Sequence, residues 1–285
     1  MIIDKSTIEQ WWNNHSQDYK QDYKSEYLGF NHSELSDYEF LKYIEELDKI
    51  FAHKAYFGQK SNKPFFSNLI TCNDLSNKNV LEVGCGLGSH SQALAERGCK
   101  LTSIDLASKS IEVTSRRLKL RNLKANVIKA DCEKLPFDDN TFDYIWSWGV
   151  IHHTTNTDQA ANEISRVLKP GGELGIMVYN NNSFYKFINV YLRYGILGLK
   201  FFQGFSRQDL KNKYTDGKQI GGAPLSKYYS KNDLINLFSD LKFIKSKCYE
   251  QKNFLTFWIP TRYKFIANNL IPSDLYSYLF KDNNF

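Results

Sequence analysis

A glycine-rich turn and an acidic residue near it are the features of this sequence with the clearest chemical use. Gly84, Gly86 and Gly88 follow a short apolar run that reads as a buried strand. Glycines at this spacing let backbone N–H groups approach a ligand, because no Cβ stands in the way. Asp105 ends the next expected strand, and its two oxygens can accept hydrogen bonds from both hydroxyls of a ribose. Together they predict a nucleoside site at one edge of a sheet.

Alternating apolar runs and amphipathic segments must position these groups. The expected strands span residues 80–83, 101–104, 125–128, 142–148 and 174–179. The expected helices span residues 89–97 and 158–168, with a third starting near residue 108. Such alternation predicts an α/β fold with a doubly wound, mostly parallel sheet covered by helices on both faces. Asp131, Ser147 and Trp148 fall at strand ends on the same side as the glycine turn, where such sheets bind ligands.

Five segments organise the chain around this sheet. We expect a helical N-terminal lid (1–60), the nucleoside-binding core (61–180), a helical and loop cap (181–229), the last helix and closing strands of the core (230–260) and a C-terminal tail (261–285). Ser36 and Glu39 have the spacing of a capping box, which places a helix start in the lid. The closing strands are expected at residues 243–249 and 254–259, which gives a sheet of seven strands.

Composition and charge exclude several classes. The five cysteines show no CxxC spacing, so we expect no disulfide framework, no metal site and a reducing, cytoplasmic location. The net charge of +6 is mild and does not indicate nucleic-acid binding. Arg193 and Lys200 interrupt the apolar stretch 187–202, so we expect a cap helix and no membrane span, with an interfacial helix as the alternative. The cluster of Lys211, Lys213 and Lys218 reads as a solvated loop face, or as a site for an anionic substrate.

Four sequence blocks resemble the class I S-adenosylmethionine-dependent methyltransferases. The blocks are residues 82–88 (EVGCGLG), 103–107 (SIDLA), 130–137 with 142–145 (ADCEKLPF and FDYI), and 150–153 with 166–172 (VIHH and RVLKPGG). The resemblance implies a Rossmann-like methyltransferase fold, S-adenosyl-L-methionine as cofactor and S-adenosyl-L-homocysteine as product. The last two blocks are similar to the small-molecule branch, which includes ubiquinone-pathway C-methyltransferases. A small-molecule acceptor is therefore expected, while its identity and the oligomeric state stay open.

The resemblance also implies cofactor-binding roles. The backbone of Gly84, Cys85, Gly86 and Gly88 would surround the cofactor, and Asp105 would bind its ribose. Glu82 would help to hold the methionine end, or would instead interact with a helix N-terminus.

Further roles follow at the adenine and methionine ends. Asp131 would accept from the adenine amine and the Cys132 N–H would face a ring nitrogen, or Asp131 would only cap a turn. Leu106 would pack on the adenine, or simply fill the core. Ser147 and Trp148 would lie near the sulfonium, although packing explains Trp148 equally well. Tyr19 in the lid would reach the methionine carboxylate.

Catalytic residues are less defined by the sequence. His152 and His153 are candidates for proton handling because imidazole titrates near neutral pH, although either can be a packed histidine. Tyr179 is a further candidate at the end of a strand. We expect in-line methyl transfer to an O, N or C atom, for which positioning matters more than a strong base. The alternatives are a nicotinamide-dependent oxidoreductase, whose fingerprint disagrees with Ser89, and a non-catalytic cofactor-binding subunit.

Overall fold

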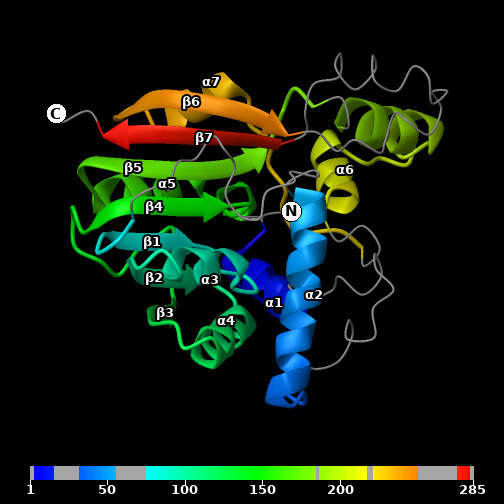
Figure 1. Ribbon diagram of the computed structural model, residues 1–285. Coiled ribbons are helices and arrows are strands. Elements are labelled where there is room, and N and C mark those ends of the chain that lie inside the picture. Colours follow the sequence, from blue (N-terminus) through cyan, green and yellow to red (C-terminus); the bar gives the residue numbers. More distant parts are fainter. Residues whose placement is uncertain are drawn as a thin grey trace, which may run out of the picture.

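A computed structural model describes residues 3–15, 32–55, 75–183, 186–216, 221–249 and 275–282. The strands are β1 (Asn79–Val83), β2 (Lys100–Asp105), β3 (Ala125–Lys129), β4 (Phe142–Trp148), β5 (Leu168–Tyr179), β6 (Leu241–Tyr249) and β7 (Leu275–Asp282). They form one seven-stranded sheet in the order β3-β2-β1-β4-β5-β7-β6 (Figure 1). This arrangement confirms the expected α/β fold.

The first five strands run parallel, and β7 pairs antiparallel with both β5 and β6. The carboxyl ends of β1, β2 and β4 therefore meet at one edge of the sheet. We expected the segment around Pro170 to precede the fifth strand, but β5 already begins at Leu168. The register shifts from Leu168 opposite Phe142 to Glu173 opposite Tyr144, so the Pro-Gly-Gly segment forms a bulge within the strand.

Nine further elements surround the sheet. They are α1 (Lys5–His15), α2 (Asp37–Ala55), α3 (Ser89–Ala95), α4 (Ser108–Leu120), the 3₁₀ turn η1 (Ile151–His153), α5 (Thr157–Val167), the π-helix η2 (Lys186–Leu197), α6 (Arg207–Tyr214) and α7 (Lys231–Leu237). Within the described ranges, none of these helices combines the length and the apolar character needed to cross a bilayer.

Alternate residues along the strands fill two separate cores. Leu81 of β1 belongs to the core that contains Ile164 of α5 and Leu234 of α7. Its neighbour Val80 belongs to the core that contains Leu94 of α3. This period of two is the one that a strand imposes on its side chains. Helices therefore cover both faces, and the strand ends of the site are held from either side.

The end of the sheet differs from the expectation. The predicted strand at 243–249 corresponds to β6, and the predicted strand at 254–259 lies outside the described residues. The strand that pairs with β6 and β5 is β7, within the segment expected to be a tail. Ser230 caps α7 as predicted, with its hydroxyl accepting from the Asp233 N–H at 3.2 Å.

The lid helix α2 begins at the predicted capping box. The Ser36 N–H donates to Glu39 Oε2 at 2.8 Å, and the Glu39 N–H donates to Ser36 Oγ at 3.3 Å. The apolar side of α2, including Phe40 and Ile44, packs on Val113 of α4. This contact fixes α2 against the core at the edge where the strands end.

Two consecutive arginines of α4 tie it to α2 in different environments. Arg117 is fully buried and forms an ion pair with Asp48, which also accepts from Ser89 Oγ at 2.6 Å. Arg116 forms an ion pair with Asp37 at 2.8 Å, and the Asp37 side chain is 69% exposed. Removing one partner of a buried pair leaves the other charge without compensation. When one partner of an exposed pair is removed, water solvates the charge that remains.

Asp48→Ala should therefore lower the free energy of unfolding by about 3 kcal/mol. The matched change at the exposed pair, Asp37→Ala, should lower it by less than about 1 kcal/mol. Urea unfolding monitored by circular dichroism gives both values. Equal losses in the two variants would contradict the importance of the buried pair.

Candidate active site

One cavity of about 420 Å³ lies at the carboxyl ends of β1, β2, β4 and β5. The glycine turn after β1 forms one wall, and α1 and α2 contribute to the other side through Trp12 and Leu47. The cavity reaches from Asp131, which follows β3, to Asp216, which follows α6. It therefore joins the edge predicted from the sequence to the lid and to the cap.

The glycine turn is shaped by backbone conformations that side chains rarely adopt. Gly84 has φ +82°, and a Cβ at this residue would lie 2.1 Å from Val150 Cγ2. Gly86 has φ +52°, and a Cβ there would meet no atom within 4 Å. Gly84 is thus needed for close packing, while Gly86 leaves open space at the cavity wall. A ligand can approach the backbone at Gly86 as the sequence predicts.

Asp105 connects this turn to the start of α4. Its Oδ2 accepts from the Gly86 N–H and its Oδ1 from the Ala107 N–H, both at 2.9 Å. Burial raises the pKa of Asp105 above its ordinary value, and the backbone donors oppose that shift. Each carboxylate oxygen keeps further accepting capacity. The side chain is therefore fixed in orientation and can still accept hydroxyl groups from the cavity.

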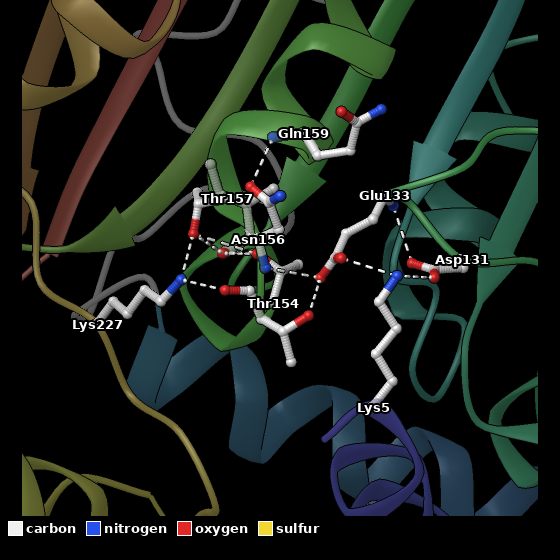
Figure 2. A network of polar contacts seen from close by, with 10 residues as sticks. Lys5, Asp131, Glu133, Thr154, Asn156, Thr157, Gln159 and Lys227 are labelled. Atoms are coloured by element: carbon white, nitrogen blue, oxygen red, sulfur yellow. Dashed lines mark hydrogen bonds and ion pairs between the residues drawn. The ribbon is translucent and has the colours of Figure 1, made fainter. Parts of the chain in front are cut away.

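Asp131 and Glu133 share a lysine from the N-terminal helix. Lys5 Nζ lies 2.6 Å from Asp131 Oδ2 and 2.8 Å from Glu133 Oε2 (Figure 2). Burial acts to lower the pKa of Lys5, but the two carboxylates together raise it above its ordinary value. Glu133 Oε1 also accepts from Thr155 Oγ1 at 2.7 Å and from the Asn156 N–H at 3.0 Å. These bonds fasten α1 to the segments that follow β3 and β4.

The helix α1 covers the cavity along one of its faces. This face presents Lys5, Ile8 and Trp12. Other contacts hold the helix on the core: Glu9 Oε1 lies 2.5 Å from Lys129 Nζ, and Asn13 Oδ1 accepts from the Lys109 N–H at 3.1 Å. The first part of the expected lid is thus in place over the site.

The end of the cavity away from Lys5 is aromatic. Trp12, Trp148, His153 and Tyr179 all line it, together with Met177. The Trp12 and His153 rings meet edge to face, with centroids 5.0 Å apart. A ring face can attract a positive charge, and the apolar bodies of these side chains limit the access of water.

Asp216 brings a carboxylate to this aromatic end. The Tyr179 hydroxyl donates to Asp216 Oδ1 at 2.6 Å, and His153 Nε2 lies 3.4 Å from Asp216 Oδ2. His153 Nδ1 lies 2.6 Å from the Leu225 carbonyl oxygen. Because a carbonyl only accepts, Nδ1 must carry a hydrogen. Both ring nitrogens of His153 therefore face protein atoms. The contact of Nε2 with Asp216 is an ion pair when the imidazole carries both protons, and the Tyr179 hydroxyl holds Asp216 by a hydrogen bond.

His152 lies behind this end of the cavity. It is fully buried, does not line the cavity and packs against the His153 and Tyr179 rings at centroid distances of 4.3 and 4.2 Å. Burial, together with His153, lowers the pKa of His152 well below its ordinary value. The expectation that His152 faces an acceptor is not met, because the backbone turn directs its ring into the core.

The comparisons with known proteins agree with this geometry. The family described as "Methyltransferase domain" matches residues 81–176. This match supports, over these residues, the resemblance to the class I S-adenosylmethionine-dependent methyltransferases. A sterol 4-C-methyltransferase from Caenorhabditis elegans is 34% identical over 99 residues, which are 34% of this chain and 30% of that protein. A ubiquinone biosynthesis O-methyltransferase from Coxiella burnetii is 32% identical over 108 residues, 38% of this chain and 46% of that protein.

A solved structure agrees in fold. A SAM-dependent methyltransferase from Methanosarcina mazei superimposes with a TM-score of 0.53 at 17% identity, covering 73% of this chain and 93% of that one. The two curated sequence matches each cover less than half of the relative's length. The sequence similarity to these two relatives therefore extends over only 34% and 38% of this chain.

The methyltransferase domain brings most of the predicted cofactor residues to the cavity. Those that line it are Gly84, Cys85, Gly86, Asp105, Leu106, Asp131, Cys132 and Trp148. Tyr179 and His153 line its aromatic end. Tyr19 lies outside the described residues. The cofactor contacts of all these side chains stay predictions.

Three predicted cofactor residues lie off the cavity wall. Glu82 is buried, and its Oε2 accepts from Ser103 Oγ at 2.7 Å and from Ser91 Oγ. Gly88 packs against Thr114 and Arg117 of α4. Ser147 is buried within β4 and is not part of the lining. Each follows or precedes a lining residue in sequence, but the alternation of the strand or the turn of the helix directs it away from the ligand space.

Several lining residues were not singled out from the sequence as site residues. They are Lys5, Trp12, His90, Glu133 and Asp216. Glu133 stands two residues after Asp131. Two carboxylates at this spacing on a turn could have been predicted to lie at the same site. Lys5, Trp12 and Asp216 arrive through the packing of the lid and the cap, which no local pattern specifies.

His152, His153 and Asp216 also form a group of potential metal ligands. One ligand atom from each lies within 4.8 Å of the others. Imidazole nitrogens with a carboxylate oxygen are a donor set that transition metals accept. Among the described residues, His153 Nδ1 and Asp216 Oδ1 have hydrogen-bond partners, whereas Asp216 Oδ2 and both ring nitrogens of His152 have none. The expected absence of a metal stays a prediction.

Glu82 gives the methyltransferase domain a pH-dependent stability. Burial raises its pKa to about 7 from the ordinary value of 4.5, and the bonds from Ser91 and Ser103 oppose that shift. Because the folded state holds the proton more tightly than the unfolded state, this contribution is present below about pH 4.5 and is lost as the pH rises through about 7. Relative to Glu82→Gln, the wild type should lose roughly 3 kcal/mol of unfolding free energy over this range.

Urea unfolding of both proteins at about pH 5 and about pH 8 measures this difference. Other groups titrate in both proteins, so their effects cancel in the comparison. A difference between the two proteins that does not change with pH would show that Glu82 is ionised in the folded state throughout.

Proposed function

We propose that this chain transfers the methyl group of S-adenosyl-L-methionine to an O, N or C atom of a small-molecule acceptor by in-line displacement. The observation that carries the proposal is a single cavity with adenosine-binding groups at one end and an aromatic, carboxylate-bearing pocket at the other. A two-substrate transfer needs both ligands in one space and in one line. The cavity offers such a space.

The residues present fit the cofactor at the end near Asp131. The open position at Gly86 can accept a ligand close to the backbone, and Asp105 retains accepting capacity beside it. We assign Asp105 to the ribose hydroxyls and Asp131 to the adenine amine, with Leu106 against the ring. Lys5 would hold Asp131 and Glu133 in the orientation that adenine binding needs. When bound, the cofactor supplies an activated methyl group, so the protein has mainly to orient two ligands and to exclude water.

The aromatic end fits the acceptor. Trp12, Trp148 and Met177 supply apolar surface, and Asp216 supplies one carboxylate that Tyr179 and His153 keep in place. The relatives named above act on a sterol and in ubiquinone biosynthesis, which supports an acceptor with an apolar body. Asp216 would orient a hydroxyl or amine of the acceptor and help to remove its proton.

We also propose a reducing, cytoplasmic location. Cys85, Cys99 and Cys132 are free thiols and are buried. Burial raises the pKa of both Cys85 and Cys132, which keeps them protonated and unreactive. Such thiols are typical of proteins that do not depend on oxidation for folding.

Binding of the cofactor tests the first half of the proposal. By isothermal titration calorimetry, the wild type should bind S-adenosyl-L-methionine, and Asp105→Asn should weaken binding by about 100-fold because charge-assisted bonds to two hydroxyls are lost. Asp139→Asn, which changes an exposed carboxylate outside the cavity, should bind like the wild type. An equal affinity of Asp105→Asn would refute the assignment of the ribose site, and NADH binding in its place would favour an oxidoreductase.

Turnover tests the second half. Wild-type protein, given methyl-labelled cofactor and a small-molecule extract, should label at least one compound. Asp216→Asn should label it about 100-fold more slowly, with cofactor affinity unchanged, because the carboxylate at the acceptor end is removed. Asp209→Asn, the other acidic change in the cap, should keep the wild-type rate. Cofactor binding without any labelled product would favour a non-catalytic binding subunit.

A further inference from the structure

Large apolar side chains gather on one part of the cap in contact with solvent. Seven large hydrophobic residues are exposed in the part of the chain that the structure describes, and five of them lie between residues 187 and 202. Four follow closely at the end of η2 and in the turn after it: Ile196, Leu197, Leu199 and Phe202, here called the apolar tip. Leu197 is 72% exposed and Phe202 is 81% exposed. A concentration of this kind marks an interaction surface, whereas single exposed residues do not.

The apolar tip is not an unfilled core of the cap. Val190, Leu210 and Tyr214 form the buried core of this region, and Tyr194 stacks on Tyr214 with centroids 3.9 Å apart. Phe201 also packs against this core, while its neighbour Phe202 points away from it. The cap is therefore packed on its inner side and still presents four further apolar side chains outward.

The backbone of the tip adds a second unfavourable feature at one of these residues. Leu199 has φ +56°, a left-handed conformation that is unfavourable for a bulky side chain and that glycine or asparagine adopts readily. Leu199 is also 55% exposed. The exposure of this side chain is explained if it enters an apolar environment when a partner binds.

The charge around the tip indicates what the partner is. Residues 186–216 contain six basic side chains and two acidic ones. Of the acidic residues, Asp209 caps α6 and Asp216 lines the cavity. Burial lowers the pKa of Lys186 to about 8, and the nearby positive charges of Lys211 and Arg207 add to this shift. Apolar side chains next to lysines and arginines are typical of segments at the surface of anionic membranes, while protein interfaces are depleted in lysine.

We propose that the apolar tip inserts into the interfacial region of a lipid bilayer with anionic headgroups, and that the exposed basic residues of the cap, Arg193 and Arg207, contact those headgroups. This association goes beyond methyl transfer and does not depend on it. Because the same cap supplies Asp216 to the cavity, docking would connect the acceptor end of the site with the membrane surface.

Vesicle co-sedimentation at low salt tests the proposal. The full chain should bind vesicles of phosphatidylcholine with about a third phosphatidylglycerol, and should bind pure phosphatidylcholine vesicles more weakly. Phe202→Ser and Leu199→Gly should each lower binding by roughly tenfold, since each removes a large apolar side chain. Tyr38→Ser, at a residue that is 69% exposed on α2, should bind like the wild type.

The variants also separate this proposal from loss of folding and from the proposed function. Leu199→Gly relieves the left-handed strain, so its thermal midpoint should not fall, and its affinity for S-adenosyl-L-methionine should stay within about twofold of the wild type. The proposal is overturned if the wild type binds neither vesicle or if the tip variants bind as well as the wild type. A dimer detected by light scattering that the tip variants abolish would also overturn it, by assigning the tip to a second copy of the chain.

Discussion

The hydrogen bond from the Gly86 N–H to the Asp105 carboxylate fixes the geometry on which the rest of the site depends. It joins the turn after β1 to the end of β2, and the second oxygen of Asp105 holds the N–H of Ala107 just before α4. One side chain therefore sets the relative position of two helix starts and of the cavity wall. Its burial is unfavourable, as the raised pKa shows, and the backbone donors offset part of that effect.

Ion pairs fix the acidic residues that follow β3 at the cavity wall. Asp131 and Glu133 would repel one another at the cavity wall, and Lys5 neutralises this repulsion by binding both. The ion pairs also hold α1, so that Trp12 reaches the aromatic end and contacts His153. The position of α1 and the arrangement of Asp131 and Glu133 thus depend on the same lysine. At the other end, Asp216 plays the corresponding part by joining the cap to Tyr179.

Local sequence patterns predicted the core well because each strand and turn there is determined by its own residues. The strand 142–148 agrees with β4 in both bounds, and the box of Ser36 and Glu39 starts α2 as expected. The patterns did not show that Trp148 lines the cavity while its neighbour Ser147 does not. Neighbouring side chains of a strand point to opposite faces of the sheet, and the pattern alone does not say which face borders the cavity. They also missed Lys5 and Asp216, which reach the cavity only through the packing of segments far apart in the chain. They also did not predict β7 in the segment expected to be a tail, since this strand is defined by its partners β5 and β6.

A crystal structure of the protein with S-adenosyl-L-homocysteine tests the central claim most directly. The account predicts density for the ribose at Asp105, for the adenine between Leu106 and Asp131, and for the sulfur toward Trp148, with Lys5 still bound to Asp131 or Glu133. Density for the adenosine anywhere other than between Gly86, Asp105 and Asp131 would contradict it.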